Sequence, residues 1–210
     1  MSFSAFNKLS YGLYIVSSVR NGRPAGCVVN TMGQVTSSPL QLAVTVNKDN
    51  ETTKAILESG KFTGVVLGEN ATMDLIGRFG FQSSADTDKF EGFATAHDLN
   101  GVPYVKEQTV ARFSCTVKGT LDVGTHIVFV GEVDEHEVLD DTTPPMTYLY
   151  YHTVKKGLTP PKASSYRPPE EKKAAGWRCS VCGYIYEGEE LPADFICPIC
   201  KKSREVFVKL

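Results

Sequence analysis

The sequence has few of the features that mark nucleic-acid-binding, membrane or secreted proteins. Its 22 Lys and Arg residues are outnumbered by 24 Asp and Glu, so the basic excess typical of nucleic-acid binders is missing. No apolar run approaches the roughly 18 residues that span a bilayer. Near the N-terminus, Lys8 and Ser10 interrupt the apolar residues, so no secretory signal is expected. The sequence therefore predicts a soluble, cytoplasmic protein that contacts neither nucleic acid nor membranes.

Cysteine is scarce over most of the chain and concentrated at its end. Cys27 and Cys115 stand alone, and we expect both to be small buried apolar residues. The other four form two C-x-x-C pairs separated by 14 residues: Cys179, Cys182, Cys197 and Cys200. A disulfide framework would spread its cysteines through the fold, whereas two close pairs can complete a tetrahedral shell of four thiolates around one ion. The spacing therefore predicts a metal site.

The composition divides the chain into three parts. Residues 159–175 hold four of the eleven prolines and almost no large apolar side chains, which is typical of an extended linker. This predicts a first domain over residues 1–158 and a second over 176–210. The second is too small for a conventional core, so a metal would have to supply much of its folding free energy.

The first domain shows the pattern of a mainly β fold. From Val110 to Lys118 apolar and polar residues alternate strictly, as in an antiparallel strand with one buried face. Further strands are predicted over 11–18, 25–35, 40–46, 61–67, 125–138 and 147–152. Two short helices are predicted over 50–60, with Ile56 and Leu57 facing inward and Gly60 as the stop, and over 71–79. Many short strands with few helices favour a barrel or sandwich.

The residues around the four cysteines bear on the choice between iron and zinc, which ligand spacing leaves open. Gly183 permits a left-handed turn that points backbone N–H groups at sulfur, and such bonds stabilise the reduced state of a redox metal. Apolar side chains nearby can form a small core around the site: Trp177, Tyr184, Ile185, Phe195, Ile199 and Phe207.

The motif C-x-x-C-G-Y-x-Y followed by C-P-x-C resembles rubredoxin over residues 177–210. This resemblance implies that the four cysteines hold one mononuclear iron; a zinc ribbon that serves as a binding module is the alternative. Lys201 stands where the second turn of that family usually has glycine. A left-handed non-glycine residue there would cost about 1 kcal/mol.

Small polar residues gather at strand ends and at the first predicted helix of the first domain. The helix start carries hydroxyls and a lysine, a combination that can bind phosphate, although such residues often only cap helices. The order of these segments from Asn30 to Leu67 resembles the flavin reductase family. The pattern G-x-H-x-x-x-x-G-E-V from Gly124 to Val133 extends the likeness over residues 1–158.

The second resemblance implies an FMN-binding split β-barrel and a set of cofactor-binding residues. The ring would lie near Asn30–Thr36 and the phosphate near the helix start. The implied residues are Asn30, Thr31, Gln34, Thr36, Ser37, Ser38, Asn47, Lys48, Asn50, Thr52 and Thr53. His126 takes the place of a histidine that approaches the nicotinamide or the flavin edge, and it is the candidate catalytic residue.

Both halves together resemble the high-molecular-weight rubredoxins, which fuse a flavin reductase to a rubredoxin. This implies an NAD(P)H-dependent oxidoreductase that passes electrons through FMN and Fe(Cys)₄ to a partner reductase such as a flavodiiron NO- or O₂-reducing protein. It also implies a homodimer. The alternatives are an FMN and iron electron carrier without its own NAD(P)H oxidation, and a non-redox module with zinc.

Overall fold

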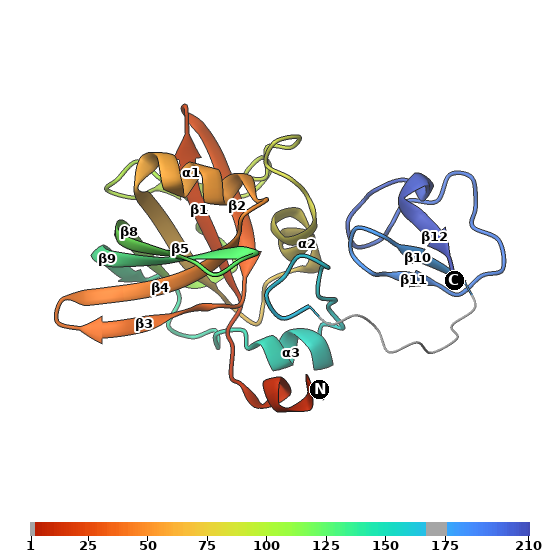
Figure 1. The fold of residues 1–210 in the computed structure, drawn as a ribbon, viewed down its shortest axis with the longest axis horizontal. Coiled ribbons are helices and arrows are strands. Elements are labelled where there is room, and N and C mark those ends of the chain that lie inside the picture. The colour runs from red at the N-terminus through yellow and green to blue at the C-terminus, as the bar shows by residue number, and fades with distance from the viewer. Residues whose placement is uncertain (1–2, 167–175) are drawn as a thin grey trace.

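The first domain is an antiparallel sheet curled into an open barrel. A computed structural model describes residues 3–166 and 176–210. Its seven main strands pair in the order β2-β1-β5-β8-β9-β4-β3, all antiparallel (Figure 1). The strands are β1 (Tyr14–Arg20), β2 (Arg23–Val29), β3 (Met32–Ser37), β4 (Leu40–Asn47), β5 (Lys61–Leu67), β8 (Thr109–Asp122) and β9 (His126–Val138). A separate pair consists of β6 (Thr95–His97) and β7 (Pro103–Val105). The predicted mainly β class is confirmed.

The strand predicted over 25–35 is in fact two strands at opposite edges of the sheet. β2 pairs with β1, and β3 pairs with β4. The chain passes from one edge to the other at Asn30 and Thr31, where the ladder is interrupted. The amide and hydroxyl side chains of these two residues therefore lie at the opening of the barrel.

The helix α1 (Glu51–Ser59) follows β4 and begins and ends as predicted. Asn50 is its N-cap residue, and Gly60 ends it with φ of 68°. The backbone N–H of Gly60 donates to the carbonyl of Ile56 at 2.9 Å. Ile56 is buried, but Leu57 is 54% exposed, so the predicted inward orientation of Leu57 is wrong. The buried face instead uses the small residues Thr52 and Thr53.

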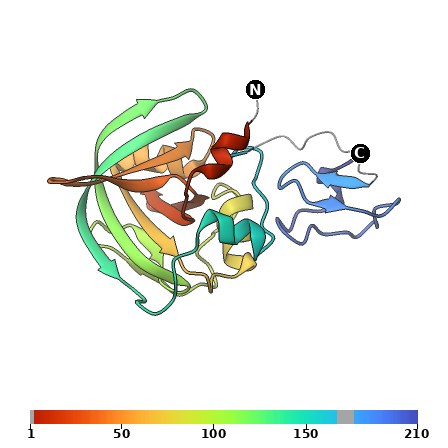
Figure 2. The ribbon, with the colours of Figure 1, turned by 90° about the horizontal axis from the view of Figure 1, so that it is seen from below.

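Residues 147–152 form a helix and not the predicted strand. In α3 (Tyr148–Thr153) the hydroxyl of Thr147 caps the first turn by accepting from the N–H of Tyr150 at 3.1 Å. Aromatic residues favour strands on average, but here a local cap and the burial of Tyr151 decide the structure. A short 3₁₀ helix (Phe3–Lys8) precedes β1 and lies on the same side of the barrel as α3 (Figures 1 and 2).

The polar face of strand β8 is buried at one end, unlike a strand with a single buried face. Arg112 is 4% exposed and donates to Glu135 at 2.6 Å and to Glu137 at 3.0 Å. Ser114 is fully buried and donates to Asp98. The segment around Asp98 and β7 folds over this face. The alternation of residues within β8 alone could not predict this burial.

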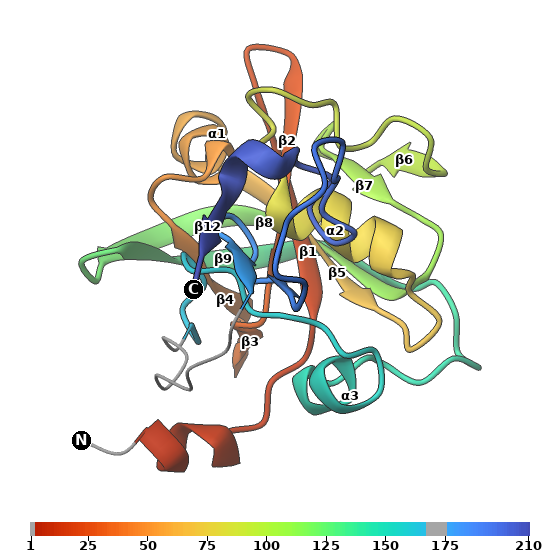
Figure 3. The ribbon, with the colours of Figure 1, turned by 90° about the vertical axis from the view of Figure 1, so that its right-hand side faces the viewer.

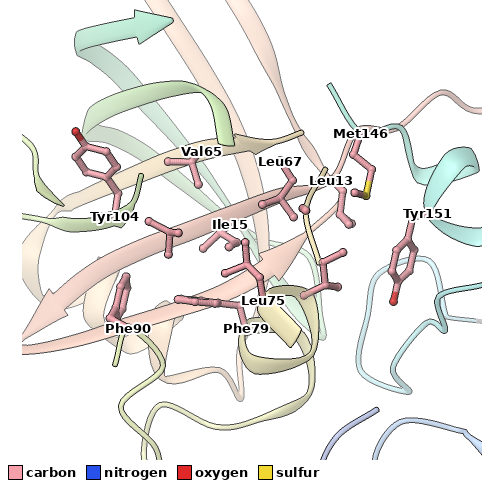
Figure 4. Close-up of a cluster of buried hydrophobic side chains, with 13 residues drawn as sticks. Leu13, Ile15, Val65, Leu67, Leu75, Phe79, Phe90, Tyr104, Met146 and Tyr151 are labelled. Carbon is pink, nitrogen blue, oxygen red and sulfur yellow. The ribbon is translucent and has the colours of Figure 1, made fainter. Parts of the chain in front are cut away.

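Two apolar clusters form the core of the first domain. One fills the barrel and contains Phe62, Phe129 and the buried Cys27 and Cys115, as predicted for the two cysteines. The other packs the helix α2 (Met73–Phe81) against β1 and β5 and extends to Met146 and Tyr151 (Figure 4). Among the described residues, none of the helices has the length and apolar character needed to traverse a bilayer.

Lys89 is a buried cation next to the second cluster. It is 4% exposed, and its Nζ donates to the carbonyls of Gly26 at 2.7 Å and Phe79 at 3.1 Å. Burial lowers its pKa from 10.5 to about 8. The unfolded chain therefore binds more protons than the folded chain between these two values, and stability rises with pH across that window.

This predicts that the stability of wild type depends on pH in a way that the stability of Lys89→Met does not. From pH 7.5 to 9.5 the free energy of unfolding of wild type should rise relative to the variant by roughly 2 kcal/mol. Urea unfolding at the two pH values measures it. If the free energy of unfolding changed equally with pH in both proteins, the lowered pKa of Lys89 would be contradicted.

The second domain is a small three-stranded sheet with two cysteine-bearing turns. The sheet order is β11 (Ile185–Tyr186), β10 (Trp177–Cys179) and β12 (Phe207–Lys209), with a 3₁₀ turn at Arg204–Val206. Thr159–Tyr166, the described part of the predicted linker, runs along the barrel. The rest of that linker, 167–175, lies outside the described residues.

Candidate metal centre and cofactor cavity

The four C-terminal cysteines converge on one point. Their Sγ atoms all lie within 4.8 Å of one another, and all four side chains are buried. The Sγ atoms of Cys179 and Cys200 are 3.6 Å apart, and those of Cys182 and Cys197 are 3.5 Å apart. A tetrahedral ion with metal–sulfur bonds of about 2.3 Å needs sulfur separations of about 3.8 Å. The cluster therefore has the donor set and nearly the spacing of a mononuclear tetrathiolate site.

Both C-x-x-C turns adopt the same left-handed geometry. Gly183 has φ of 81° and Lys201 has φ of 59°, which confirms the conformation expected for Lys201. The N–H of Gly183 donates to the Cys179 carbonyl at 2.9 Å, and the N–H of Lys201 donates to the Cys197 carbonyl at 3.0 Å.

These turns aim further backbone N–H groups at sulfur. Tyr184 donates to the Sγ of Cys182, and Lys202 donates to the Sγ of Cys200. Such bonds stabilise added negative charge on the ligands, so the donor set fits a metal that is reduced in place.

Aromatic side chains shield one side of the cysteine cluster. The ring centroids of Phe195 and Phe207 are 5.3 Å apart, and those of Tyr186 and Phe195 are 4.9 Å apart. Of the predicted core residues, Phe207 is buried, and Trp177, Tyr184, Phe195 and Ile199 pack against the cluster. Ile185 is 37% exposed and is not part of this core. It lies on the two-residue strand β11, which places it on the solvent side of the sheet.

Four of the sequence-predicted flavin residues and the candidate catalytic residue line one cavity at the opening of the barrel. The cavity has a volume of about 70 Å³, and Leu13, Val29 and Ile76 supply apolar walls. The predicted residues that line it are Asn30, Thr31, Asn47, Asn50 and His126. Its mixture of apolar walls with a few neutral polar groups is typical of a small-molecule site.

Residues 158–166, called here the strap, lie across this cavity. The amide of Asn30 donates to the Ser165 hydroxyl at 2.9 Å and accepts from the Ser164 hydroxyl at 3.2 Å. The amide of Asn47 donates to the Lys162 carbonyl at 2.9 Å. The hydrogen-bonding groups expected to meet a ligand are thus turned toward the strap and into the cavity.

His126 lies at the rim of the same cavity. Its Nδ1 lies 2.8 Å from the Thr125 hydroxyl, and its ring also bonds to the Lys162 carbonyl. Burial lowers the pKa of His126 below its usual value, and the bond to Lys162 offsets only part of this effect. The lowered pKa therefore favours the neutral form of the imidazole.

The remaining predicted residues lie elsewhere. Gln34, Thr36, Ser37 and Ser38 lie on or at the end of the hairpin of β3 and β4, which projects from the barrel (Figure 1). The ammonium of Lys48 pairs with Asp122 at 2.5 Å on the surface. Thr53 donates to the carbonyl of Asn47 at 2.7 Å, and Thr52 lines a neighbouring cavity with Asn50. The assignment of these residues to flavin stays a prediction.

Several lining residues were not identified from the sequence. Phe81 from α2 and the α3 residues Tyr148 and Tyr151 line the same cavity. Tyr148 also bonds to the Thr159 hydroxyl at 2.6 Å and the Ser165 hydroxyl at 2.9 Å. The cluster of tyrosines in this segment was the available signal, but its interpretation as a strand concealed it.

Comparisons with known proteins agree with both halves of this description. Residues 6–159 match the flavin reductase like domain family, and residues 177–208 match the rubrerythrin, rubredoxin-like domain family. A high molecular weight rubredoxin from Moorella thermoacetica is 35% identical over the full length of both chains. A ferric-chelate reductase (NAD(P)H) from Archaeoglobus fulgidus is 47% identical over 79% of this chain and 98% of its own.

A solved structure shares the barrel. Nitrilotriacetate monooxygenase component B from Mycobacterium thermoresistibile superposes with a TM-score of 0.61 and 26% identity. The match covers 68% of this chain and 78% of that protein. The predicted fold, a flavin reductase-like split barrel with a rubredoxin-like C-terminal domain, is confirmed.

Proposed function

The chain belongs to the flavin reductase like family and carries a rubredoxin-like domain, and from this premise we propose that it is an NAD(P)H-dependent flavoprotein oxidoreductase. It takes a hydride from NAD(P)H at an FMN in the barrel and passes single electrons to one iron held by the four cysteines. The observation that carries this proposal is the buried tetrathiolate cluster joined in one chain to a barrel with a cavity of amides and hydroxyls. The high molecular weight rubredoxin of similar sequence supports it.

The metal ligands are Cys179, Cys182, Cys197 and Cys200. Iron held by four thiolates exchanges one electron between its ferric and ferrous states. The chain stabilises the ferrous state through the N–H groups of Tyr184 and Lys202. The apolar shell around Phe207 keeps water from the sulfur atoms.

The flavin would be held at the barrel opening. FMN supplies the step that links a two-electron hydride donor to a one-electron acceptor. Asn30 and Asn47 can exchange their bonds with the strap for bonds to the polar edge of the ring. Thr31 can likewise exchange its bond to the Thr45 carbonyl in β4. The side chain of Asn50 makes no capping bond at the start of α1 and bonds to the Cys27 thiol instead, so the backbone N–H groups of the helix N-terminus would meet the phosphate.

Nicotinamide would enter the same cavity, because the chain has no G-x-G-x-x-G fingerprint for a separate dinucleotide site. The neutral form of His126 at the rim can donate to or accept from an uncharged amide. The overall reaction balances as one NAD(P)H and two ferric ions giving NAD(P)⁺, a proton and two ferrous ions. The ferrous centre then reduces a partner protein, for which the family resemblance suggests a flavodiiron reductase.

In a homodimer, the projecting hairpin of β3 and β4 would contact the second copy of the chain. Strand β3 is an edge strand with exposed residues along most of its length, including Val35 at 52% exposure. In a second copy, Gln34, Thr36, Ser37 and Ser38 could reach the cavity that they do not line in their own chain. Light scattering should give twice the mass of the chain.

Replacing His126 tests its position at the rim. His126→Ala should slow the reduction of bound flavin by NAD(P)H roughly tenfold, as expected when one hydrogen bond of about 1.4 kcal/mol is lost in the transition state. His126→Gln should restore part of the rate. Anaerobic stopped-flow absorption of the flavin measures it.

The matched control is His136→Ala, on the same strand but exposed and beside Phe113. It should keep the wild-type rate. Equal rates in the His126 and His136 variants would remove His126 from the reaction.

A visible spectrum with metal analysis of the purified protein tests the proposed function as a whole. We expect flavin absorption in the barrel together with ferric thiolate absorption and about one iron per chain. A colourless protein with zinc would refute it.

A further inference from the structure

The helix α2 lies between the barrel and the rubredoxin-like domain. Figures 1 and 3 show the C-terminal domain alongside this helix, and Figure 3 looks onto the helix through that domain. Two residues of α2 contact the domain directly: Gly77 at the middle of the helix and Phe81 at its end. Their contacts define how the metal centre sits on its own barrel.

Gly77 allows the closest approach. A Cβ atom added to Gly77 would lie 2.9 Å from the backbone oxygen of Ile199, which lies between the two cysteines of the second metal-binding turn. A backbone oxygen cannot rotate away as a flexible side chain can. Any side chain at position 77 therefore displaces the turn that carries Cys197 and Cys200.

Phe81 belongs to both sites. It is 7% exposed and packs in the same apolar cluster as the four cysteines, Leu191 and Phe207. It also lines the cavity that contains Asn30, Asn47 and His126. One aromatic ring thus fills the space between the proposed flavin site and the thiolates.

Tyr151 provides a second link between the two sites. It lines the flavin cavity, and its hydroxyl lies close enough to the Cys182 thiol to interact with it electrostatically. The hydroxyl donates to the Leu158 carbonyl at 2.9 Å, so its orientation is fixed by the strap. Figure 4 shows the ring of Tyr151 extending away from Met146 at the edge of the core.

We propose that the C-terminal part of α2 is the docking surface for this chain's own metal domain, and that Phe81 is a positioning residue between flavin and iron. The proposal rests on the proposed function. In each transfer reduced flavin loses one electron and the ferric ion gains it. Two transfers consume the electron pair of one hydride and release its proton to solvent, with the ferrous ion giving its electron to the partner protein after each transfer.

Docking of the metal domain on α2 sets the rate of electron transfer from flavin to iron within one chain. Electron transfer slows steeply with the separation of the two centres, and packed side chains carry it better than a water-filled gap. A domain held against α2 by Gly77 and Phe81 therefore exchanges electrons with the flavin of its own chain, and the partner subunit is not needed.

Gly77→Leu tests the docking surface. The substitution keeps α2 helical, because Leu is a better helix former than Gly, but it places a side chain against the Ile199 carbonyl. The matched control is Asp74→Leu, which puts the same residue on an exposed position of the same helix. Full-length proteins loaded with flavin and iron are used.

Two measurements are made on each protein. Stopped-flow absorption follows flavin reduction by NAD(P)H and the later bleaching of the ferric band. Amide hydrogen exchange, which does not depend on turnover, follows residues 73–81 and 197–202. In Gly77→Leu we expect ferric bleaching to slow at least tenfold, flavin reduction to be unchanged, and exchange to accelerate in both segments. Asp74→Leu should behave as wild type.

The outcomes separate the docking surface from the proposed function. Wild-type bleaching in Gly77→Leu, with or without faster exchange, would overturn the proposal, because the metal domain would then be working from another position or on the partner subunit. An equally slow ferric bleaching in Asp74→Leu would also overturn the proposed docking surface. If wild type binds no flavin, the proposed function fails, and the exchange comparison alone decides whether α2 is the docking surface.

Discussion

The variant Cys197→Ser should purify without iron and without the ferric thiolate absorption. Cys197 is fully buried, and its Sγ lies 3.5 Å from that of Cys182. A serine hydroxyl stays protonated near neutral pH and does not replace a thiolate on iron. Because the metal supplies much of the folding free energy of so small a domain, residues 176–210 should also lose their structure. Metal analysis should fall from about one iron per chain to nearly none.

A control for this prediction is Cys115→Ala. Cys115 is equally buried but lies in the barrel between Phe62 and Phe129. Its replacement should cost about 1 kcal/mol of stability and leave the iron content unchanged. Full iron in Cys197→Ser, or loss of iron in Cys115→Ala, would be incompatible with the assigned ligands.

The second large effect is expected at Asp98, which ties the segment between β6 and β7 to the main sheet. It is 8% exposed and accepts hydrogen bonds from the hydroxyls of Thr63 and Ser114. It also accepts from the N–H groups of Asn100 at 2.9 Å and Val102 at 2.8 Å. Asp98→Ala would leave buried donors without an acceptor. It should therefore lower the free energy of unfolding by about 2–4 kcal/mol.

Thermal unfolding would detect this loss as a Tm lower by roughly 5–15 °C. The comparison is Asp122→Ala, which removes an exposed carboxylate paired with Lys48 and should leave the Tm nearly unchanged. If both variants have the same Tm as wild type, the buried hydrogen bonds of Asp98 contribute nothing to the stability of the fold.

The metal centre was predictable because its chemistry is local in sequence. Two C-x-x-C turns specify four sulfur atoms, and Gly183 and Lys201 fix the turns by their own backbone conformations. The helix α1 was predictable for the same reason, since Gly60 directly follows the last turn that it caps.

Features that depend on distant packing were not predictable. Arg112 looks like a surface residue of an alternating strand, but Glu135, Glu137 and the ring of Tyr104 surround it. Residues 147–152 have strand-forming side chains, yet the cap at Thr147 makes them helical. The role of Phe81 depends on a domain that begins almost a hundred residues later in the chain.

The most direct test of the central claim is an anaerobic titration of the purified full-length protein with NAD(P)H, followed by visible absorption. A chain that holds one flavin and one iron takes up three electrons, so both chromophores should be bleached completely by about 1.5 equivalents of NAD(P)H. Bleaching of the flavin alone, with the ferric band intact after minutes, would show that the two centres are not connected and would contradict the account.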